Sequence, residues 1–151
     1  FDVNGKIIIV GRSDGSGSND IVVTRYNNDG LLDTTFGVNG VVITDIGGSN
    51  DRSRAVVLDS NDKIIVQGTS DSKGNDDFVI LRYNSDGSLD TSFGVNGIAT
   101  VDFGGIDIGE EIALDSNGLI IVVGRSDTGS GNDFAFNGNR KFFSNEDDQN
   151  F

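Results

Sequence analysis

A fifteen-residue motif occurs twice in this chain, and its repetition constrains the fold more than any other feature. Residues 26–40 read YNNDGLLDTTFGVNG and residues 83–97 read YNSDGSLDTSFGVNG, so the two copies are offset by 57 positions. A fixed period of this length is typical of tandem repeat proteins, in which each unit packs against its neighbours. The sequence therefore predicts an array of similar units.

A second segment extends this period over most of the chain. The stretches that begin at Asp2, Asp59 and Asp115 read DVNGKIIIVG, DSNDKIIVQG and DSNGLIIVVG, with offsets of 57 and 56 residues. The one-residue difference falls in the loop after the repeated Gly-Gly, where a length change is tolerated. The repeat unit is therefore about 57 residues long.

Four short strands are expected in each unit. In the second unit they are residues 54–58, 63–68, 77–83 and 98–103, separated by turn-forming residues that favour antiparallel hairpins. The runs AVVL, IIV and FVIL do not alternate apolar with polar residues, which indicates that both faces of these strands are covered. We therefore predict an all-β, β-propeller-like array of four-stranded antiparallel blades.

This reading divides the chain into four parts. Residues 1–58 are a partial blade plus the first strand of the next unit, and residues 59–114 are a full repeat unit. Residues 115–136 are a partial unit, and residues 137–151 are a non-repeat tail, interpreted as a disordered or artefactual end rather than a docking segment. About two and a half blades result. A propeller needs about four to eight, so the ring is incomplete unless the chain belongs to a larger chain or an oligomer.

The repeat motif resembles a known family. The pattern RYNxDGxLDTxFGxNG, preceded by DxxxKIIVxG and a GNDDFVILRYN-like segment, is similar to the delta-60 repeats, predicted β-propeller repeats of bacterial extracellular and cell-surface proteins. The resemblance covers residues 2–136. It implies a propeller fold and an extracellular or cell-surface location, and it carries no catalytic residues over to this chain.

Charge and composition restrict the partners. The formal net charge is −13, so a nucleic-acid backbone or an anionic membrane surface would be repelled. No apolar run approaches the ~18 residues that span a bilayer, and membrane insertion is not expected. The expected partners are other copies of the chain or the rest of a longer propeller, with a surface glycan or a protein as a further ligand.

The loop before the third strand of each unit is the candidate binding site. Carboxylate, amide and hydroxyl oxygens on a glycine-containing loop suit a hard cation such as calcium, whereas the simpler interpretation is a set of polar turns. No other cofactor is expected. The calcium candidates are Asp14, Asn19, Asp20, Asp71, Asp76, Asp77, Asp127, Asn132 and Asp133.

Other polar clusters are weaker candidates. The repeated motif carries Asp33 and Asp90 but lacks the glutamate that closes an EF-hand loop, so we assign these residues to turn structure. Glu110 and Glu111 are adjacent carboxylates without a histidine or cysteine anywhere in the chain, and neighbours on a strand point to opposite faces. We therefore expect no enzyme activity.

These features favour a non-enzymatic extracellular β-propeller repeat module. It would act as a structural or protein-interaction scaffold, by self-assembly or by presenting its loops to a partner. The alternative is a glycan-binding propeller lectin, assisted by calcium. A third hypothesis is a fragment of a hydrolase ring.

Overall fold

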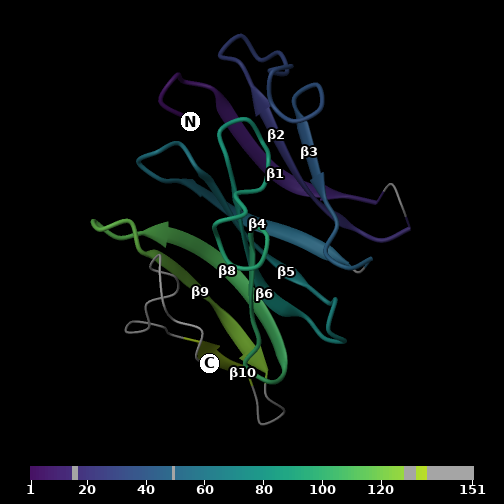
Figure 1. Cartoon of the computed structure of the whole chain (residues 1–151). Coiled ribbons are helices and arrows are strands. Elements are labelled where there is room, and N and C mark those ends of the chain that lie inside the picture. The colour runs from purple at the N-terminus through teal and green to yellow at the C-terminus, as the bar shows by residue number, and fades with distance from the viewer. Residues whose placement is uncertain (15–16, 49, 128–131, 136–151) are drawn as a thin grey trace.

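The computed structural model describes residues 1–14, 17–48, 50–127 and 132–135, the last range by its backbone alone. Ten strands in the described ranges form three antiparallel sheets, which we call the first, middle and third blades (Figure 1). The first blade has the order β1-β2-β3 (Ile7–Ser13, Asp20–Tyr26, Val41–Thr44). The middle blade has the order β4-β5-β6-β7 (Asp51–Leu58, Ile64–Ser70, Asp77–Tyr83, Ile98–Val101). The third blade has the order β8-β9-β10 (Ile106–Leu114, Ile120–Asp127, Asn132–Ala135).

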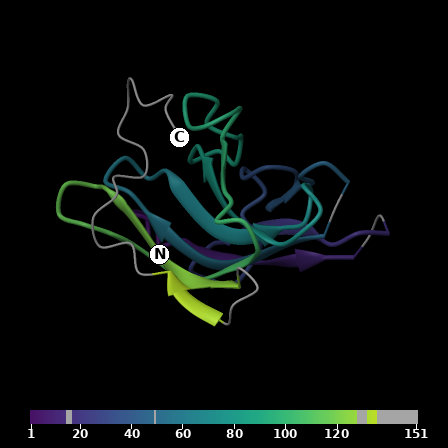
Figure 2. The same ribbon diagram turned by 90° about the horizontal axis from the view of Figure 1, so that it is seen from below.

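The predicted all-β fold of stacked antiparallel blades is confirmed. The sheets lie one on another in chain order, seen from two directions in Figures 1 and 2. The four strands expected in the second unit correspond to β4 to β7 of the middle blade. The parts of the chain that the structure describes contain no helix that could cross a membrane.

Several strand boundaries differ from the prediction by one to three residues, and β5 spans Ile64–Ser70 instead of 63–68. Strand β4 begins at Asp51, earlier than the expected residue 54, because the pairing with β5 continues beyond a bulge between Ser53 and Ala55. Strand β7 ends at Val101, before the expected residue 103. Here Asp102 turns the chain, since its Oδ1 accepts a 2.6 Å hydrogen bond from the backbone amide of Gly104.

The unit boundaries drawn from the sequence do not coincide with the blades. The boundary after Leu58 falls between β4 and β5, and the boundary after Leu114 falls between β8 and β9. Each sequence unit therefore begins at the second strand of one blade and ends with the first strand of the next. The predicted tail, residues 137–151, lies outside the described residues.

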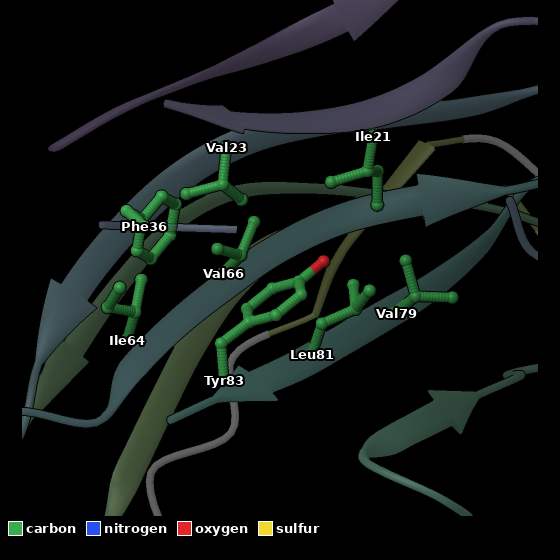
Figure 3. Close-up of a cluster of buried hydrophobic side chains, with 8 residues drawn as sticks. All are labelled: Ile21, Val23, Phe36, Ile64, Val66, Val79, Leu81 and Tyr83. Atoms are coloured by element: carbon green, nitrogen blue, oxygen red, sulfur yellow. The ribbon is translucent and has the colours of Figure 1, made fainter. Parts of the chain in front are cut away.

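The middle blade is buried on both faces, as its uninterrupted apolar runs predicted. All seven residues of β5 are buried. One face packs on the first blade through a cluster shown in Figure 3, in which side chains from β5 and β6 meet those of β2 and the motif. The cluster comprises Ile21, Val23, Phe36, Ile64, Val66, Val79, Leu81 and Tyr83.

The opposite face of the middle blade packs on the third blade. The buried members of this second cluster are Ile65, Ile80, Phe93, Ala99, Ile112 and Ile120. Consecutive residues of β5 thus enter different cores, as the two-residue period of a strand requires. Burial of both faces makes the interfaces between blades the main apolar cores of the fold.

The repeated motif occurs in the first and middle blades, where it forms the turns between β2 and β3 and between β6 and β7. Asp90 accepts hydrogen bonds from Arg82 Nε (2.8 Å) and the Ser92 amide (3.2 Å), and Lys63 Nζ lies 3.0 Å from its Oδ2. The amide of Phe93 donates to the backbone carbonyl of Asp90 at 3.0 Å. The Phe93 ring is buried and lies 4.7 Å from the Arg82 guanidinium carbon. The assignment of this motif to turn structure agrees with these contacts.

Candidate metal centres at the blade junctions

The loop residues singled out as calcium candidates do not form one site. Asp14 is exposed after β1, and Asn19 Nδ2 donates to Asn50 Oδ1 at 3.1 Å. Asp71 accepts hydrogen bonds from the same Asn50, from its amide at 2.7 Å and from Nδ2 at 3.0 Å. Asp76 forms an ion pair of 3.4 Å with Arg52. These side chains support the loops.

The remaining five candidates lie on strands rather than in the loops. Asp127 ends strand β9, and Asn132 and Asp133 lie on β10, of which only the backbone is described. Asp20 and Asp77 begin β2 and β6, and both are buried. Among the candidates whose side chains the structure describes, Asp20 and Asp77 are those that lie in a carboxylate cluster.

Two such clusters occur in the described chain, one at each blade junction. In each, one carboxylate oxygen from each of three aspartates lies within 4.8 Å of the other two. The first cluster comprises Asp20, Asp45 and Asp51, and the second comprises Asp77, Asp102 and Asp107. The second repeats the first at offsets of 57, 57 and 56 residues. The clusters are therefore a property of the repeat.

The same backbone frame holds both clusters. At the second junction the amide of Asp107 donates to the carbonyl of Asp76 (2.6 Å), and the amide of Phe103 donates to Asp107 Oδ2 (2.6 Å). At the first junction the equivalent bonds join Asp51 to Asn19 (2.7 Å) and Ile46 to Asp51 Oδ2 (2.6 Å). These bonds bring β4 against the start of β2 at the first junction and β8 against the start of β6 at the second.

The second cluster contains buried oxygens without hydrogen-bond partners. Within the described residues, neither carboxylate oxygen of Asp77 has a partner, and neither Asp107 Oδ1 nor Ser126 Oγ has one. The exposed fractions of Asp77, Asp107 and Ser126 are 1%, 0% and 5%. Burial raises the pKa of Asp77 above its ordinary 3.8, and the nearby Asp102 carboxylate raises it further. Buried polar atoms normally have hydrogen-bond partners or a compensating charge. The described residues provide neither for these oxygens of the second cluster.

Sequence reasoning missed four members of these clusters: Asp45, Asp51, Asp102 and Asp107. It considered each loop before a third strand by itself, whereas a cluster draws on three segments from two blades. A signal was present in the repeats, because Asp45 and Asp102 each precede a large apolar residue and two glycines, in DIGG and DFGG. The buried Asp51 and Asp107 follow within six residues.

Other polar groups of the repeats have local contacts. Tyr83 is buried, and its hydroxyl lies 2.7 Å from Thr44 Oγ1, so its ring does not offer a surface for stacking a ligand. Arg25 Nε lies 2.7 Å from Asp33 Oδ2, and a hydrogen bond from Lys6 holds the pKa of Asp33 well below its usual range. Glu110 and Glu111 are exposed next to a bulge in β8.

Comparison with known proteins agrees with this architecture. Residues 4–36 and 60–93 match the family model described as "Domain of unknown function (DUF5122) beta-propeller". These two stretches are thus similar to repeats of a β-propeller family, which supports the propeller-like architecture, and the name delta-60 stays a resemblance. The matched stretches begin at the turns before β1 and β5 and end at Phe36 and Phe93 of the motif. No curated protein matches the chain.

Proposed function

We propose that this array of β-propeller repeats is a non-enzymatic, extracellular scaffold whose blades stack on further blades of the same type. This proposal rests on the exposed apolar side chains of the first and third blades, whose outer faces are not covered by any other described residues. The delta-60 resemblance supports the extracellular setting, and the acidic surface is suited to a soluble assembly.

The uncovered faces can be compared with the middle blade position by position. Ile9 on β1 corresponds to Val66 on β5, and their exposed fractions are 51% and 0%. Ile121 on β9 corresponds to Ile65 on β5, with exposed fractions of 41% and 2%. The sequence places apolar residues where a neighbouring blade would bury them. Each buried side chain of this size contributes about 1.5–3 kcal/mol.

The edge of the first blade supports the same proposal. In the described chain β1 pairs with β2 alone, whereas the equivalent β5 pairs with β4 and with β6. An open strand edge is a template for pairing with another strand. A further blade strand, from another copy or from a longer propeller chain, would satisfy both the edge and the apolar face.

Sedimentation equilibrium of the 151-residue chain tests this proposal. We expect the wild-type chain to associate, and Ile9→Asp and Ile121→Asp to weaken association at least tenfold. Val95→Asp is the matched control, because Val95 is 78% exposed in the motif and belongs to neither end face. A folded wild-type monomer of 15.9 kDa at all concentrations would contradict the proposal.

A second candidate function, glycan binding, is favoured by one polar hollow between the first and middle blades. The hollow has a volume of about 340 Å³ and is lined by Lys6 and Arg25 on one side and by Ser85 and Asp86 on the other. A glycan array with wild type and Asn4→Ala, a change in the exposed lining, tests it. Selective binding that the substitution weakens supports the lectin function, and an absence of binding contradicts it.

A further inference from the structure

The second blade junction has the oxygen chemistry of a hard-cation site. Asp77 comes from β6 of the middle blade, Asp102 follows β7 of the same blade, and Asp107 lies on β8 of the third blade. Three carboxylates this close repel one another strongly when all are ionised, and two of them are buried. A cation between them would remove both the repulsion and the cost of burial.

The spacing of the oxygens fits one cation. Calcium binds oxygen ligands at about 2.3–2.6 Å, so two oxygens on one ion can lie up to ~5 Å apart. The cluster oxygens lie within 4.8 Å of one another. Three carboxylates rarely lie this close together in a protein without a counter-charge.

The unpartnered atoms around the cluster are the independent observation. Both oxygens of the buried Asp77 lack a hydrogen-bond partner among the described residues. Ser126 Oγ is also buried and unpartnered, and it is not an acid. Ser126 pairs directly with Asp107 across β8 and β9, so both side chains lie on one face of the third blade. The same face carries Ile120, which packs on the middle blade, and Ser126 is thus directed toward the cluster.

Two basic side chains, Arg52 and Lys73, do not neutralise this group. Arg52 pairs with Asp76 at 3.4 Å, on the neighbouring residue of β6, and both side chains are partly exposed. Lys73 acts on Asp77 only at a distance and does not offset the effect of burial. Asp90, by contrast, forms ion pairs with both Lys63 and Arg82. The repeat thus provides basic side chains for the motif carboxylate.

We propose that Asp77, Asp102 and Asp107 bind one divalent cation of the calcium type, which ties the middle blade to the third blade. Carboxylate oxygens from both blades provide the charge, and Ser126 Oγ and water complete the oxygen set. The cation fixes the short connection between β7 and β8, which carries Asp102. Asp14 and Asp127, which are also calcium candidates from the sequence, are not part of this site.

Calcium binding measured by isothermal titration calorimetry on the full chain tests the site. We expect Asp77→Asn to bind one calcium ion fewer than the wild type, and Asp14→Asn, an exposed carboxylate outside the cluster, to bind the same number. Equal stoichiometry of the wild type and Asp77→Asn, including no binding by either, would overturn the proposal. Magnesium titrated in parallel tests the preference for the larger ion.

Thermal unfolding gives a second readout that does not depend on binding heat. With calcium at a hundred times the dissociation constant, the Tm of the wild type should rise by about 5 °C or more. Without calcium, Asp77→Asn should unfold at a higher temperature than the wild type because it removes one buried charge, and calcium should not raise its Tm by the same amount. An equal calcium-dependent rise in both proteins would contradict the site.

Discussion

The hydroxyl groups of Tyr83 and Thr44 lie 2.7 Å apart across the interface between the first and middle blades. Both residues are buried, Tyr83 completely. Figure 3 shows the Tyr83 ring among the apolar side chains of this interface. The pair is a polar contact within an otherwise apolar core, and it joins β6 of one blade to β3 of the other.

Replacing this hydroxyl should destabilise the interface. Tyr83→Phe leaves Thr44 Oγ1 buried without its partner, and we expect the free energy of unfolding to fall by about 1–2 kcal/mol. Tyr26→Phe is the matched control, since Tyr26 occupies the same repeat position on β2 and is only half-buried. Urea unfolding measures both. Equal losses in the two variants would show that the contact across the interface is not the cause.

Ionisation of Tyr83 should be delayed. Burial raises the pKa of Tyr83 to about 12 from the ordinary 10.0. A tyrosine whose folded-state pKa is raised stabilises the fold fully below pH 10, and this contribution is lost as the pH rises toward 12. In Tyr26→Phe, Tyr83 is the single tyrosine, so ultraviolet absorbance follows it alone. Titration near pH 10 in the folded protein would contradict its burial.

Two equivalent glycines should respond differently to alanine. A Cβ on Gly68 would lie 2.4 Å from the Arg52 carbonyl oxygen on β4, whereas a Cβ on Gly11 meets no atom within 4 Å among the described residues. Neither glycine has a positive φ. We expect Gly68→Ala to lose about 2 kcal/mol or more and Gly11→Ala to change monomer stability by less than about 0.5 kcal/mol.

The same Gly11→Ala variant also reports on assembly. If a further strand pairs with the open edge of β1, Gly11 takes up the crowded position that Gly68 has beside β4. Association should then weaken although the monomer is unaffected. Unchanged association would mean that nothing occupies the edge of β1 in the way that β4 occupies the edge of β5.

The motif carboxylates should make the fold sensitive to acid. Hydrogen bonds from Ser92 and Lys63 hold the pKa of Asp90 far below its ordinary 3.8. The ionised form therefore stabilises the fold above pH 3.8, and this contribution is lost as the pH falls through the lowered folded-state value.

Asp90→Asn measures that contribution. At pH 7 it should cost about 2 kcal/mol, because Arg82 and Lys63 lose their shared partner. The difference from the wild type should shrink as the pH falls below 4. Asp29→Asn, which replaces an exposed turn carboxylate, is the control and should cost less than Asp90→Asn at pH 7. A constant difference between Asp90→Asn and the wild type at all pH values would exclude the ion pairs as its origin.

Much of the fold could be predicted because the same local sequence pattern occurs in more than one repeat unit. The apolar runs of β5 and β6 contain no polar alternation, and burial on both faces follows directly from that. The turn residues around Asp90 belong to one hairpin, so their role in the turn could also be predicted. In each case the pattern that carries the prediction lies within one short segment of the sequence.

The carboxylate clusters could not be predicted in the same way. Asp77 and Asp107 are thirty residues apart and belong to different blades, and only the packing of one blade on the next brings them together. The loop candidates shared the residue types of a cation site, but hydrogen bonds such as those from Asn50 to Asp71 already satisfy them. Residue type identified the chemistry, and blade stacking determined which aspartates converge.

Hydrogen exchange of the β1 amides at increasing chain concentration tests most directly whether the blades continue beyond this array. We expect Ile7–Ser13 to exchange rapidly in the dilute chain and to become protected as the chain associates, while β5 stays protected throughout because it is paired on both edges. Protection of β1 that does not change with concentration, in a chain that remains a monomer, would contradict the proposed stacking of blades on blades.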